Sequence, residues 1–182
     1  MLRLCSSSET RASLLKKANI EFTQNGVNFD EDSIVATTAK EFVYKATIGK
    51  YKEALKQFDF QELPLLVADT VVTSNSKILR KAYSKEQAKE ILLTQSNSQT
   101  SIITCMIYKS HKIELIDISS TTYFFREFDE DSLNEYLNSE LWRGKAGACM
   151  VEGFCKEYIQ EVRGAESTAM GLHTELLKEF VD

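Results

Sequence analysis

Apolar and polar positions along the chain follow two different periods, and each period predicts a different kind of element. Short runs rich in Val, Ile, Leu and Phe predict strands, and the run LPLLVADTVVT is so nearly continuous that it is typical of a strand buried on both faces. Two long predicted strands flank the turn-like KSHK and indicate a hairpin. The predicted strands are Leu2–Cys5, Ile20–Gln24, Leu63–Thr73, Ser101–Tyr108, Ile113–Phe125, Ala146–Val151 and Phe154–Val162.

Apolar residues spaced three or four apart predict helices between these strands. One helix start carries a capping signal, because Ser84 is followed three positions later by Gln87 and then by an apolar series. The predicted helices are Ser8–Asn19, Thr38–Phe58, Ser84–Leu93, Asp129–Asn138 and Ser167–Phe180. Strands that alternate with helices, with a hairpin in the middle, indicate a mixed α/β fold around an elongated sheet.

The length and charge of the chain limit what it can do. With 182 residues, 43% of them hydrophobic, it can form a substantial core as one domain over residues 1–182. A net charge of −5, with Lys and Arg scattered along the chain, argues against nucleic-acid binding. No apolar run is long enough to span a membrane and no secretory signal pattern stands at the start, so we expect a cytoplasmic protein.

The cysteines and histidines do not have the spacing of a metal site. The four cysteines include no C-x-x-C pair, and the two histidines, His111 and His173, lie far apart in the sequence. We therefore expect reduced thiols, as is usual in the cytoplasm, and rate a zinc hydrolase that uses the two histidines as the weakest interpretation.

The run CSSSETR, Cys5 to Arg11, stands between the first predicted strand and the first predicted helix. Serines at this place can simply cap the helix. They can also bind phosphate, because backbone N–H groups and the positive end of a helix point at an anion there. The hydroxyls of Ser6 and Ser8 and the guanidinium of Arg11 would add to such a site. The local sequence leaves both readings open.

Acidic residues form the second candidate feature. Asp69 lies inside a strand that is otherwise expected to be fully buried, where a charge is costly unless it is paired or binds a metal. It can instead lie at the carboxyl end of that strand and cap the next turn. Asp30 and Glu31 follow the second predicted strand and are solvated surface if taken alone. Together with Asp69, however, they offer the few carboxylates that hold Mg²⁺ against substrate phosphates.

Single lysines and a glycine-rich stretch complete the candidates. Lys45, Lys81 and Lys145 stand at expected helix or loop positions, where most lysines are surface residues. The stretch GKAGACMVEG, Gly144–Gly153, contains three glycines around a short apolar segment. Such glycines indicate a close approach of the backbone to a ligand or to another strand.

In this order, these features resemble the Maf family of nucleoside triphosphate pyrophosphatases over almost the whole chain. The most specific element of the family, A-D-T-V-V, stands at Ala68–Val72, and the opening A-S-x-S-P-R-R run is matched by Ser6, Ser8 and Arg11. Further matches are the acidic pair Asp30–Glu31, the K-A pair Lys45–Ala46, Lys81 of a G-K-P loop, the loose match FREFDEDSLNEY, KAGACMVEG for K-A-G-A-Y-G-I-Q-G, and the terminal GLH.

The chain also departs from the family pattern. Glu9 and Thr10 stand where the family has proline and the first arginine, and Ala82 replaces the proline of G-K-P. One branch of the family, which prefers dTTP and UTP, has the threonine and lysine found here at Thr70 and Lys145, but a glutamine near the end. Another branch, which acts on 7-methyl-GTP, has a glutamate there, as this chain does at Glu152. The base preference is therefore open, and Glu152 can face either the base or the metal.

The resemblance implies an elongated, strongly twisted mixed sheet flanked by helices, as in the inosine triphosphate pyrophosphatases, with two lobes around a central cleft as one arrangement. It implies hydrolysis of a nucleoside triphosphate to a monophosphate and pyrophosphate with Mg²⁺ or Mn²⁺, and a homodimer as partner state. By this resemblance the catalytic residues are Asp69, Glu31 and Lys81, the metal ligands are Glu31 and Asp69, and Asp69 activates water. The phosphate and nucleotide contacts are Ser6, Ser8, Arg11, Lys45, Thr70, Lys81, Lys145 and Glu152.

Two other functions remain as rivals. The chain can be a nucleotide-binding regulator of cell division or septum formation with weak or no catalysis. The loss of the first arginine of the family pair and of the G-K-P loop supports this alternative. It can also be an inosine triphosphate pyrophosphatase, against which the match at ADTVV and KAGA counts.

Overall fold

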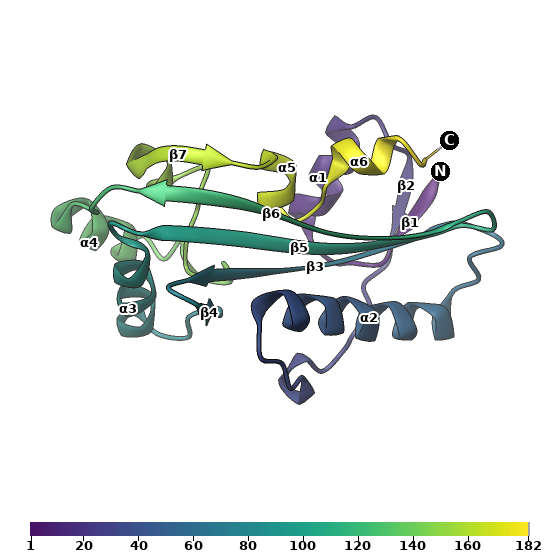
Figure 1. Ribbon diagram of the computed structural model, residues 1–182, viewed down its shortest axis with the longest axis horizontal. Helices are drawn as coiled ribbons and strands as arrows, with labels where there is room; N and C mark the ends of the chain where they lie inside the picture. Colours follow the sequence, from purple (N-terminus) through teal and green to yellow (C-terminus); the bar gives the residue numbers. More distant parts are fainter. Residues whose placement is uncertain (182) are drawn as a thin grey trace. The chain divides into compact units, whose positions relative to one another are not determined.

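The computed structural model describes residues 1–181 and has a mixed α/β fold, as predicted (Figure 1). The strands are β1 Leu2–Leu4, β2 Phe22–Gln24, β3 Leu65–Ser74, β4 Lys77–Leu79, β5 Gln99–Lys109, β6 Glu114–Phe125 and β7 Ile159–Arg163. The helices are α1 Glu9–Lys17, α2 Ala39–Gln57, α3 Lys85–Gln95, α4 Glu130–Asn138, α5 Glu166–Ala169 and α6 Thr174–Lys178, with 3₁₀ helices η1 Glu31–Ser33 and η2 Phe154–Tyr158.

The strands form one mixed sheet in the order β2-β1-β3-β5-β6-β7, and β4 pairs with β3 outside this series. β1 is parallel to both of its neighbours, with Leu2 opposite Phe22 and Arg3 opposite Leu65. β4 is antiparallel to β3, and β7 is antiparallel to β6. The predicted hairpin is present, since Ser110 N–H donates to the carbonyl of Ile113 at 2.9 Å between β5 and β6.

The contacts of the chain divide it into two compact units, which we describe separately. Unit 1 comprises residues 1–70, 103–120 and 165–181, and unit 2 comprises residues 71–102 and 121–164. The expected arrangement of two lobes around a central cleft stays a prediction.

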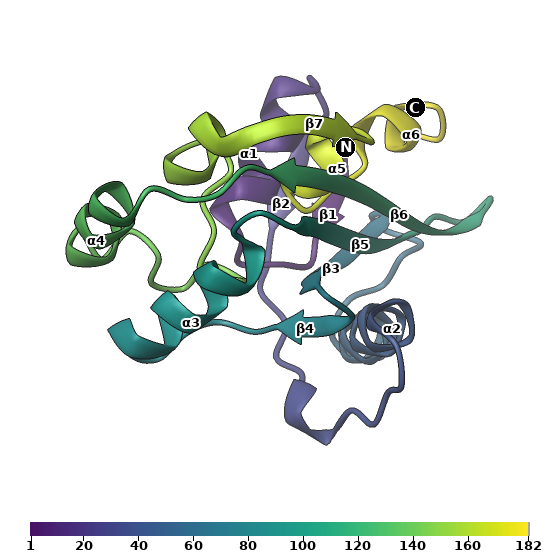
Figure 2. The same ribbon diagram turned by 60° about the vertical axis from the view of Figure 1, so that its left-hand side comes forward.

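In unit 1 the alternation of side chains along β3 supplies two separate cores. Leu66 and Ala68 pack in the cluster that contains the apolar face of α1. Leu65 and Val67 pack in the cluster that contains the apolar face of α2. Figures 1 and 2 show these two helices on opposite sides of the strands. Because successive strand residues point to opposite faces, Asp69 continues the α2 side and Thr70 the α1 side.

Hydroxyl side chains cap the helices at the positions that the sequence indicates. Ser8 Oγ accepts a hydrogen bond from the backbone N–H of Arg11 at 3.3 Å at the start of α1. Ser84 Oγ accepts one from the N–H of Gln87 at 3.2 Å at the start of α3. Both caps satisfy a backbone donor that has no partner inside its helix.

In unit 2 the predicted strand Ala146–Val151 is wrong. Ala146 makes only an isolated bridge with Lys81, and the segment is otherwise turns and irregular backbone. Positive φ angles at Gly147 and Ala148 prevent an extended strand here. The predicted strand Phe154–Val162 is half correct, because its first part is the 3₁₀ helix η2 and only its second part is β7. In η2 the ring of Phe154 stacks on that of Tyr136, with 4.6 Å between the ring centroids.

The single closing helix predicted at Ser167–Phe180 is also wrong. The segment instead contains the short helices α5 and α6. Between them Gly171 has a φ of +102°, a backbone conformation that a continuous helix cannot contain. The strand β4 had no strong apolar pattern and was not predicted.

The expectation of four reduced thiols is corrected at one pair. Cys149 and Cys155 form a disulfide in unit 2, whereas Cys5 and Cys105 are free and buried in unit 1. The turns of Gly144–Gly153 bring the two sulfurs together, which the spacing of six residues alone does not predict.

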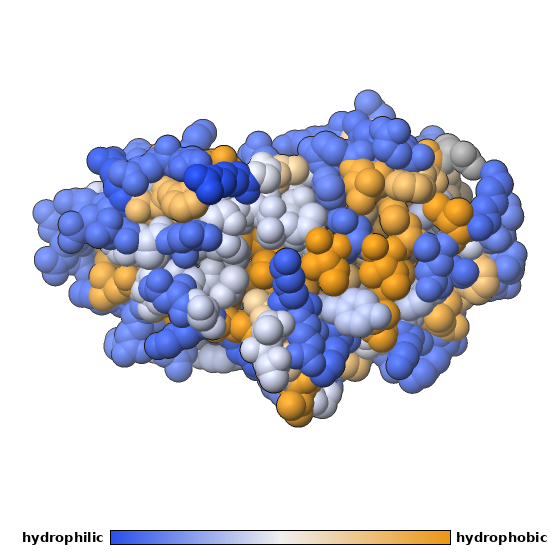
Figure 3. Space-filling view, in the orientation of Figure 1, coloured by the Kyte–Doolittle hydropathy of each residue, from blue (hydrophilic) through white to orange (hydrophobic). Residues whose placement is uncertain are grey.

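The surface in Figure 3 shows separate hydrophobic patches between hydrophilic side chains. The large apolar side chains most exposed to solvent are Tyr83 and Val35, at 85% and 83%, and they lie in different units. Within residues 1–181, none of the helices has the length and apolar character needed to cross a membrane.

Candidate functional site

The candidate residues of unit 1 gather at the carboxyl end of β1, between its parallel neighbours β2 and β3. The chain leaves β1 through α1 on one face and reaches β3 through α2 on the other, so this end is a topological switch point of the sheet. Ligands of open α/β sheets bind at such points. The N–H of Cys5 donates to the carbonyl of Leu66 at 2.8 Å, which places the following serine turn beside the part of β3 that leads to Asp69.

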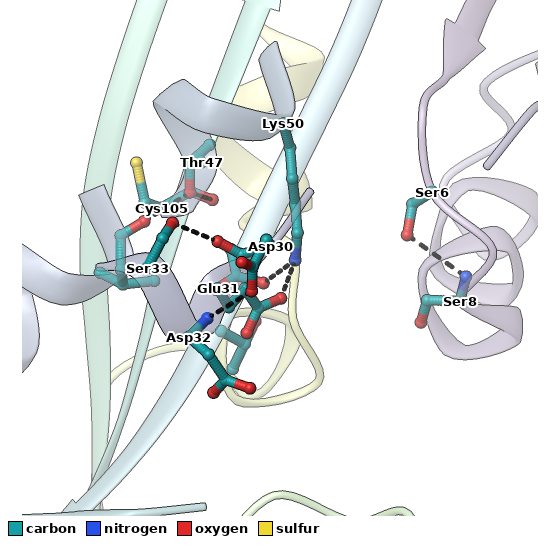
Figure 4. A network of polar contacts seen from close by, with 12 residues as sticks. Ser6, Ser8, Asp30, Glu31, Asp32, Ser33, Thr47, Lys50 and Cys105 are labelled. Carbon is teal, nitrogen blue, oxygen red and sulfur yellow. Dashed lines mark hydrogen bonds and ion pairs between the residues drawn. The ribbon is translucent and has the colours of Figure 1, made fainter. Parts of the chain in front are cut away.

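Ser6 and Ser8 form the serine turn between β1 and α1. Ser6 Oγ accepts hydrogen bonds from the N–H of Ser8 at 3.2 Å and from Arg11 Nη1 at 3.1 Å (Figure 4 shows the two serines). A hydroxyl has two lone pairs and one proton, so Ser6 can meet any further group only as a donor. The turn therefore caps the helix and also presents a donor at the helix start, where an anion is favoured. The two readings of the sequence are compatible.

Arg11 projects from α1 and is held at each of its three nitrogens. Nε donates to the carbonyl of Gly171 at 2.8 Å, Nη1 to Ser6, and Nη2 to Thr70 Oγ1 at 3.1 Å. Burial lowers the pKa of Arg11, while the negative charges of Asp69 and Glu31 act in the opposite direction. A guanidinium carries five N–H donors, so two remain beyond these three bonds.

Asp69 is buried, with 7% of its surface exposed, and pairs with a lysine that the sequence did not single out. Lys50 Nζ lies 2.5 Å from Asp69 Oδ1. The same nitrogen lies 2.6 Å from Glu31 Oε1 (Figure 4). One ammonium group thus joins two carboxylates that come from β3 and η1. Burial raises the pKa of Asp69, the Lys50 charge and hydrogen bond lower it, and Glu31 raises it again.

The neighbouring loop is held so that Glu31, rather than Asp30, faces Lys50. Asp30 Oδ1 accepts from the N–H of Asp32 at 3.0 Å and caps η1. The ring of Phe29 packs directly against Gly49 in α2, where a Cβ would overlap it. Of the acidic pair, Asp30 therefore caps η1 and Glu31 belongs to the candidate site.

Lys45 does not join this group. Its Nζ donates to Glu41 Oε1 at 2.6 Å and to the carbonyl of Val35 at 2.8 Å on the outer side of α2. The resemblance gives Lys45 a phosphate contact, but the lysine of α2 that lies beside Asp69 is Lys50. A signal for it was present in the sequence, because Lys50 lies four residues after Ala46 and four before Ala54, in the buried stripe of the helix.

In unit 2 the structure brings Lys81, Lys145 and Glu152 close together. Lys81 pairs with Ala146 in an isolated antiparallel bridge, and Lys145 Nζ lies 3.8 Å from Glu152 Oε1. Both side chains of that ion pair are about half exposed, at 40% and 55%, so the pair contributes little to stability and both groups can meet a ligand. The close approach indicated by the glycines occurs at Gly147, where a Cβ would lie 3.0 Å from the side chain of Val72 in β3.

The carboxylates of unit 1 suit a divalent cation of the magnesium type. No group of three or more His, Cys, Asp or Glu within residues 1–181 is arranged to hold a metal. His173 Nδ1 lies 3.1 Å from Asp117 Oδ2. Glu31 and Asp69, however, each place an oxygen within 2.6 Å of the same cationic nitrogen. Mg²⁺ is commonly held by one or two carboxylates completed by phosphate oxygens and water, so this donor set fits it.

Fold and site together define a class: an α/β protein with a serine turn at a helix start and a carboxylate pair at the switch point of its sheet. The model of the family described as Maf-like protein matches residues 1–182. The chain belongs to the Maf family.

Three similar proteins bear the name nucleoside triphosphate pyrophosphatase. One from a Nitratiruptor species is 51% identical over 182 residues, which cover 99% of this chain and 98% of that protein. One from Campylobacter jejuni subsp. doylei is 38% identical over the full length of both chains. One from Helicobacter pylori is 37% identical over 96% of this chain and 91% of its own.

Proposed function

We propose that the protein hydrolyses a nucleoside triphosphate between its α- and β-phosphates, giving a monophosphate and pyrophosphate. A water oxygen bonds to the α-phosphorus, and the bond between this phosphorus and the oxygen that bridges to the β-phosphate breaks. Pyrophosphate leaves with the electron pair of that bond. Family membership and the names of the similar proteins support this reaction. The observation that carries it is the buried Asp69 with Lys50 and Glu31, on the strand next to the serine turn.

Each residue of unit 1 has a role in this proposal that follows from its contacts. Asp69 is the base that accepts the proton of the attacking water, and its raised pKa makes it a better acceptor than an exposed aspartate. The hydroxyl of Ser6, which already accepts two hydrogen bonds, donates a hydrogen bond to a phosphate oxygen. Arg11 and Lys50 bring positive charge to the leaving pyrophosphate, where negative charge builds up.

Glu31 and Asp69 are the residues that would hold Mg²⁺ or Mn²⁺. A bound divalent ion would neutralise phosphate charge and lower the pKa of coordinated water. Lys50 Nζ lies between the two carboxylates. In this proposal Lys50 turns to the phosphates, which offer it equivalent anionic oxygens.

The substrate is a non-canonical or pyrimidine nucleotide, either of the dTTP and UTP kind or of the 7-methyl-GTP kind. Glu152 and Lys145 in unit 2 are the groups that would distinguish these bases. An ionised carboxylate only accepts hydrogen bonds, so Glu152 favours a base edge with N–H donors, as guanine has. Lys145 only donates, and it favours a carbonyl such as those of thymine and uracil.

The experiment is pyrophosphate release from a panel of common and modified nucleoside triphosphates, each with Mg²⁺ or Mn²⁺. Asp69→Asn should lower kcat by about 10²- to 10⁴-fold, the usual share of a general base. Asp131→Asn, on an exposed residue of α4, is the matched control. Glu152→Gln should shift the preference towards pyrimidines. Normal turnover by folded Asp69→Asn would exclude the role given to Asp69.

The alternative is a nucleotide-binding regulator of cell division with little catalysis. It is favoured by the exposed Glu9 and Thr10 at the start of α1, which leave Arg11 as the single guanidinium of the turn. Tight binding of a nucleotide without pyrophosphate release from any member of the panel would support it.

A further inference from the structure

A chain of hydroxyl groups runs from Arg11 into the interior of unit 1. Arg11 Nη2 lies 3.1 Å from Thr70 Oγ1, Thr70 Oγ1 lies 2.9 Å from Thr104 Oγ1, and Thr104 Oγ1 lies 2.8 Å from the carbonyl oxygen of Thr168. Thr104 and Thr168 are fully buried, at 0% and 1% exposure. This series of three hydrogen bonds thus links the guanidinium to the interior of unit 1.

The direction of every hydrogen bond in this chain is fixed by its two ends. The carbonyl of Thr168 can only accept, so the single proton of the Thr104 hydroxyl points to it. Thr104 must then accept from Thr70, which uses the single proton of the Thr70 hydroxyl. Thr70 therefore turns a lone pair towards Arg11, which can only donate.

We propose that Thr104 is a positioning residue for Arg11, and that Thr70 acts through Arg11 rather than by donating a hydrogen bond to the nucleotide. Thr104 holds the Thr70 hydroxyl in the one orientation that accepts from the guanidinium. This inference rests on the proposed function only in giving Arg11 a phosphate to bind.

A second contact of the same arginine supports a positioning role. Gly171 accepts the Nε–H of Arg11 at 2.8 Å, and a Cβ on Gly171 would lie 3.2 Å from Thr70 Oγ1 and 3.3 Å from Arg11 Nε. The backbone at this point therefore approaches both groups closely. Three bonds from Gly171, Ser6 and Thr70 fix the plane of the guanidinium, and its remaining donors then have a defined direction.

The test uses Thr104→Val, which keeps the shape of the side chain and removes the hydroxyl. Without Thr104 as acceptor, the Thr70 proton is free to turn towards Arg11 and to oppose its N–H group. A hydrogen bond to a charged group is worth about 1.5–3 kcal/mol, which is about tenfold or more in affinity. We expect about tenfold weaker binding of inorganic pyrophosphate by calorimetry, and a shifted or broadened Arg11 Nε–H signal in the ¹⁵N NMR spectrum.

Two controls separate positioning from packing. Thr104→Ser keeps the hydroxyl and should restore most of the affinity and the Arg11 signal. Thr100→Val removes another buried threonine hydroxyl of β5, one that has no hydrogen-bond partner among the described residues, and should change neither readout. Should Thr104→Val not fold, Thr70→Val and Thr70→Ser make the same comparison one step nearer to Arg11.

The outcomes also separate this inference from the proposed function. Unchanged pyrophosphate affinity and an unchanged Arg11 signal in Thr104→Val would overturn the positioning role, whatever the enzyme hydrolyses. Equal impairment of Thr104→Val and Thr104→Ser would overturn it too, because serine keeps the hydroxyl and the effect would then not come from the hydrogen bond. Absence of pyrophosphate release from the wild-type protein would reject the proposed function, while the NMR comparison would still decide the role of Thr104.

Discussion

Removal of Lys50 should destabilise the protein strongly, because it leaves two carboxylates without their shared cation. In Lys50→Met the side chain keeps its length and apolar stem. Asp69 would remain buried, with its side chain only 9% exposed, and its pairing charge would be lost. Removing one partner of a buried ion pair costs about 3–5 kcal/mol. The Glu31 half of the contact adds little, because that side chain is 43% exposed.

We therefore expect a loss of about 3 kcal/mol in the free energy of unfolding, at the lower end of that range. For a chain of this length, about 2–4 °C of melting temperature correspond to 1 kcal/mol, so the melting temperature should fall by about 6–12 °C. Urea unfolding and a thermal scan at neutral pH measure the two quantities. Lys52→Met, on the exposed side of the same helix, is the control and should change stability by less than about 0.5 kcal/mol.

Divalent ions extend this test to the carboxylate pair itself. In Lys50→Met the two carboxylates are free to bind Mg²⁺, and an ion at ten times its Kd would return about 1.4 kcal/mol. Removal of the ion with a chelator should abolish the gain, and the double variant Lys50→Met/Asp69→Asn should show none. A Lys50→Met protein as stable as Lys52→Met would refute the reasoning, because Asp69 would then not depend on Lys50.

Three further predictions follow from other features. Burial raises the pKa of Asp69 above its ordinary value of 3.8, so its contribution to stability is present below that pH and is lost as the pH rises through the folded pKa. In urea titrations, the free energy of unfolding of the wild type should therefore fall relative to that of Asp69→Asn as the pH rises from about 4. A relative increase would contradict this prediction. Thiol titration of the unfolded, unreduced chain should find two groups, and four after reduction of Cys149–Cys155; four from the outset would disprove the disulfide. Gly171→Ala should cost about 1–3 kcal/mol in urea unfolding, because alanine is strained at a φ of +102°; unchanged stability would speak against that strain.

Local signals in the sequence predicted much of the fold and part of the site. The continuous apolar run around Asp69 indicated a buried strand with one charge, and Ser8 indicated a helix start. Both depend on neighbours in the sequence, which is why they could be predicted. The strand predicted at Ala146–Val151 failed because the segment turns with positive φ at Gly147 and Ala148, and a short apolar run alone does not distinguish such turns from a strand.

By itself the sequence determined most of the strands and helices, though not β4 or the two short closing helices, together with the capping residues and the set of motifs that resembles the Maf family. These follow from local periodicity and from residue types at fixed spacing. Only the tertiary structure decided that Lys50 contacts Asp69 and that Thr70 contacts Thr104. Those pairings join residues 19 and 34 positions apart, and they depend on how α2 and β5 pack beside β3. Such packing is a property of the assembled sheet, and no segment of the chain contains it alone.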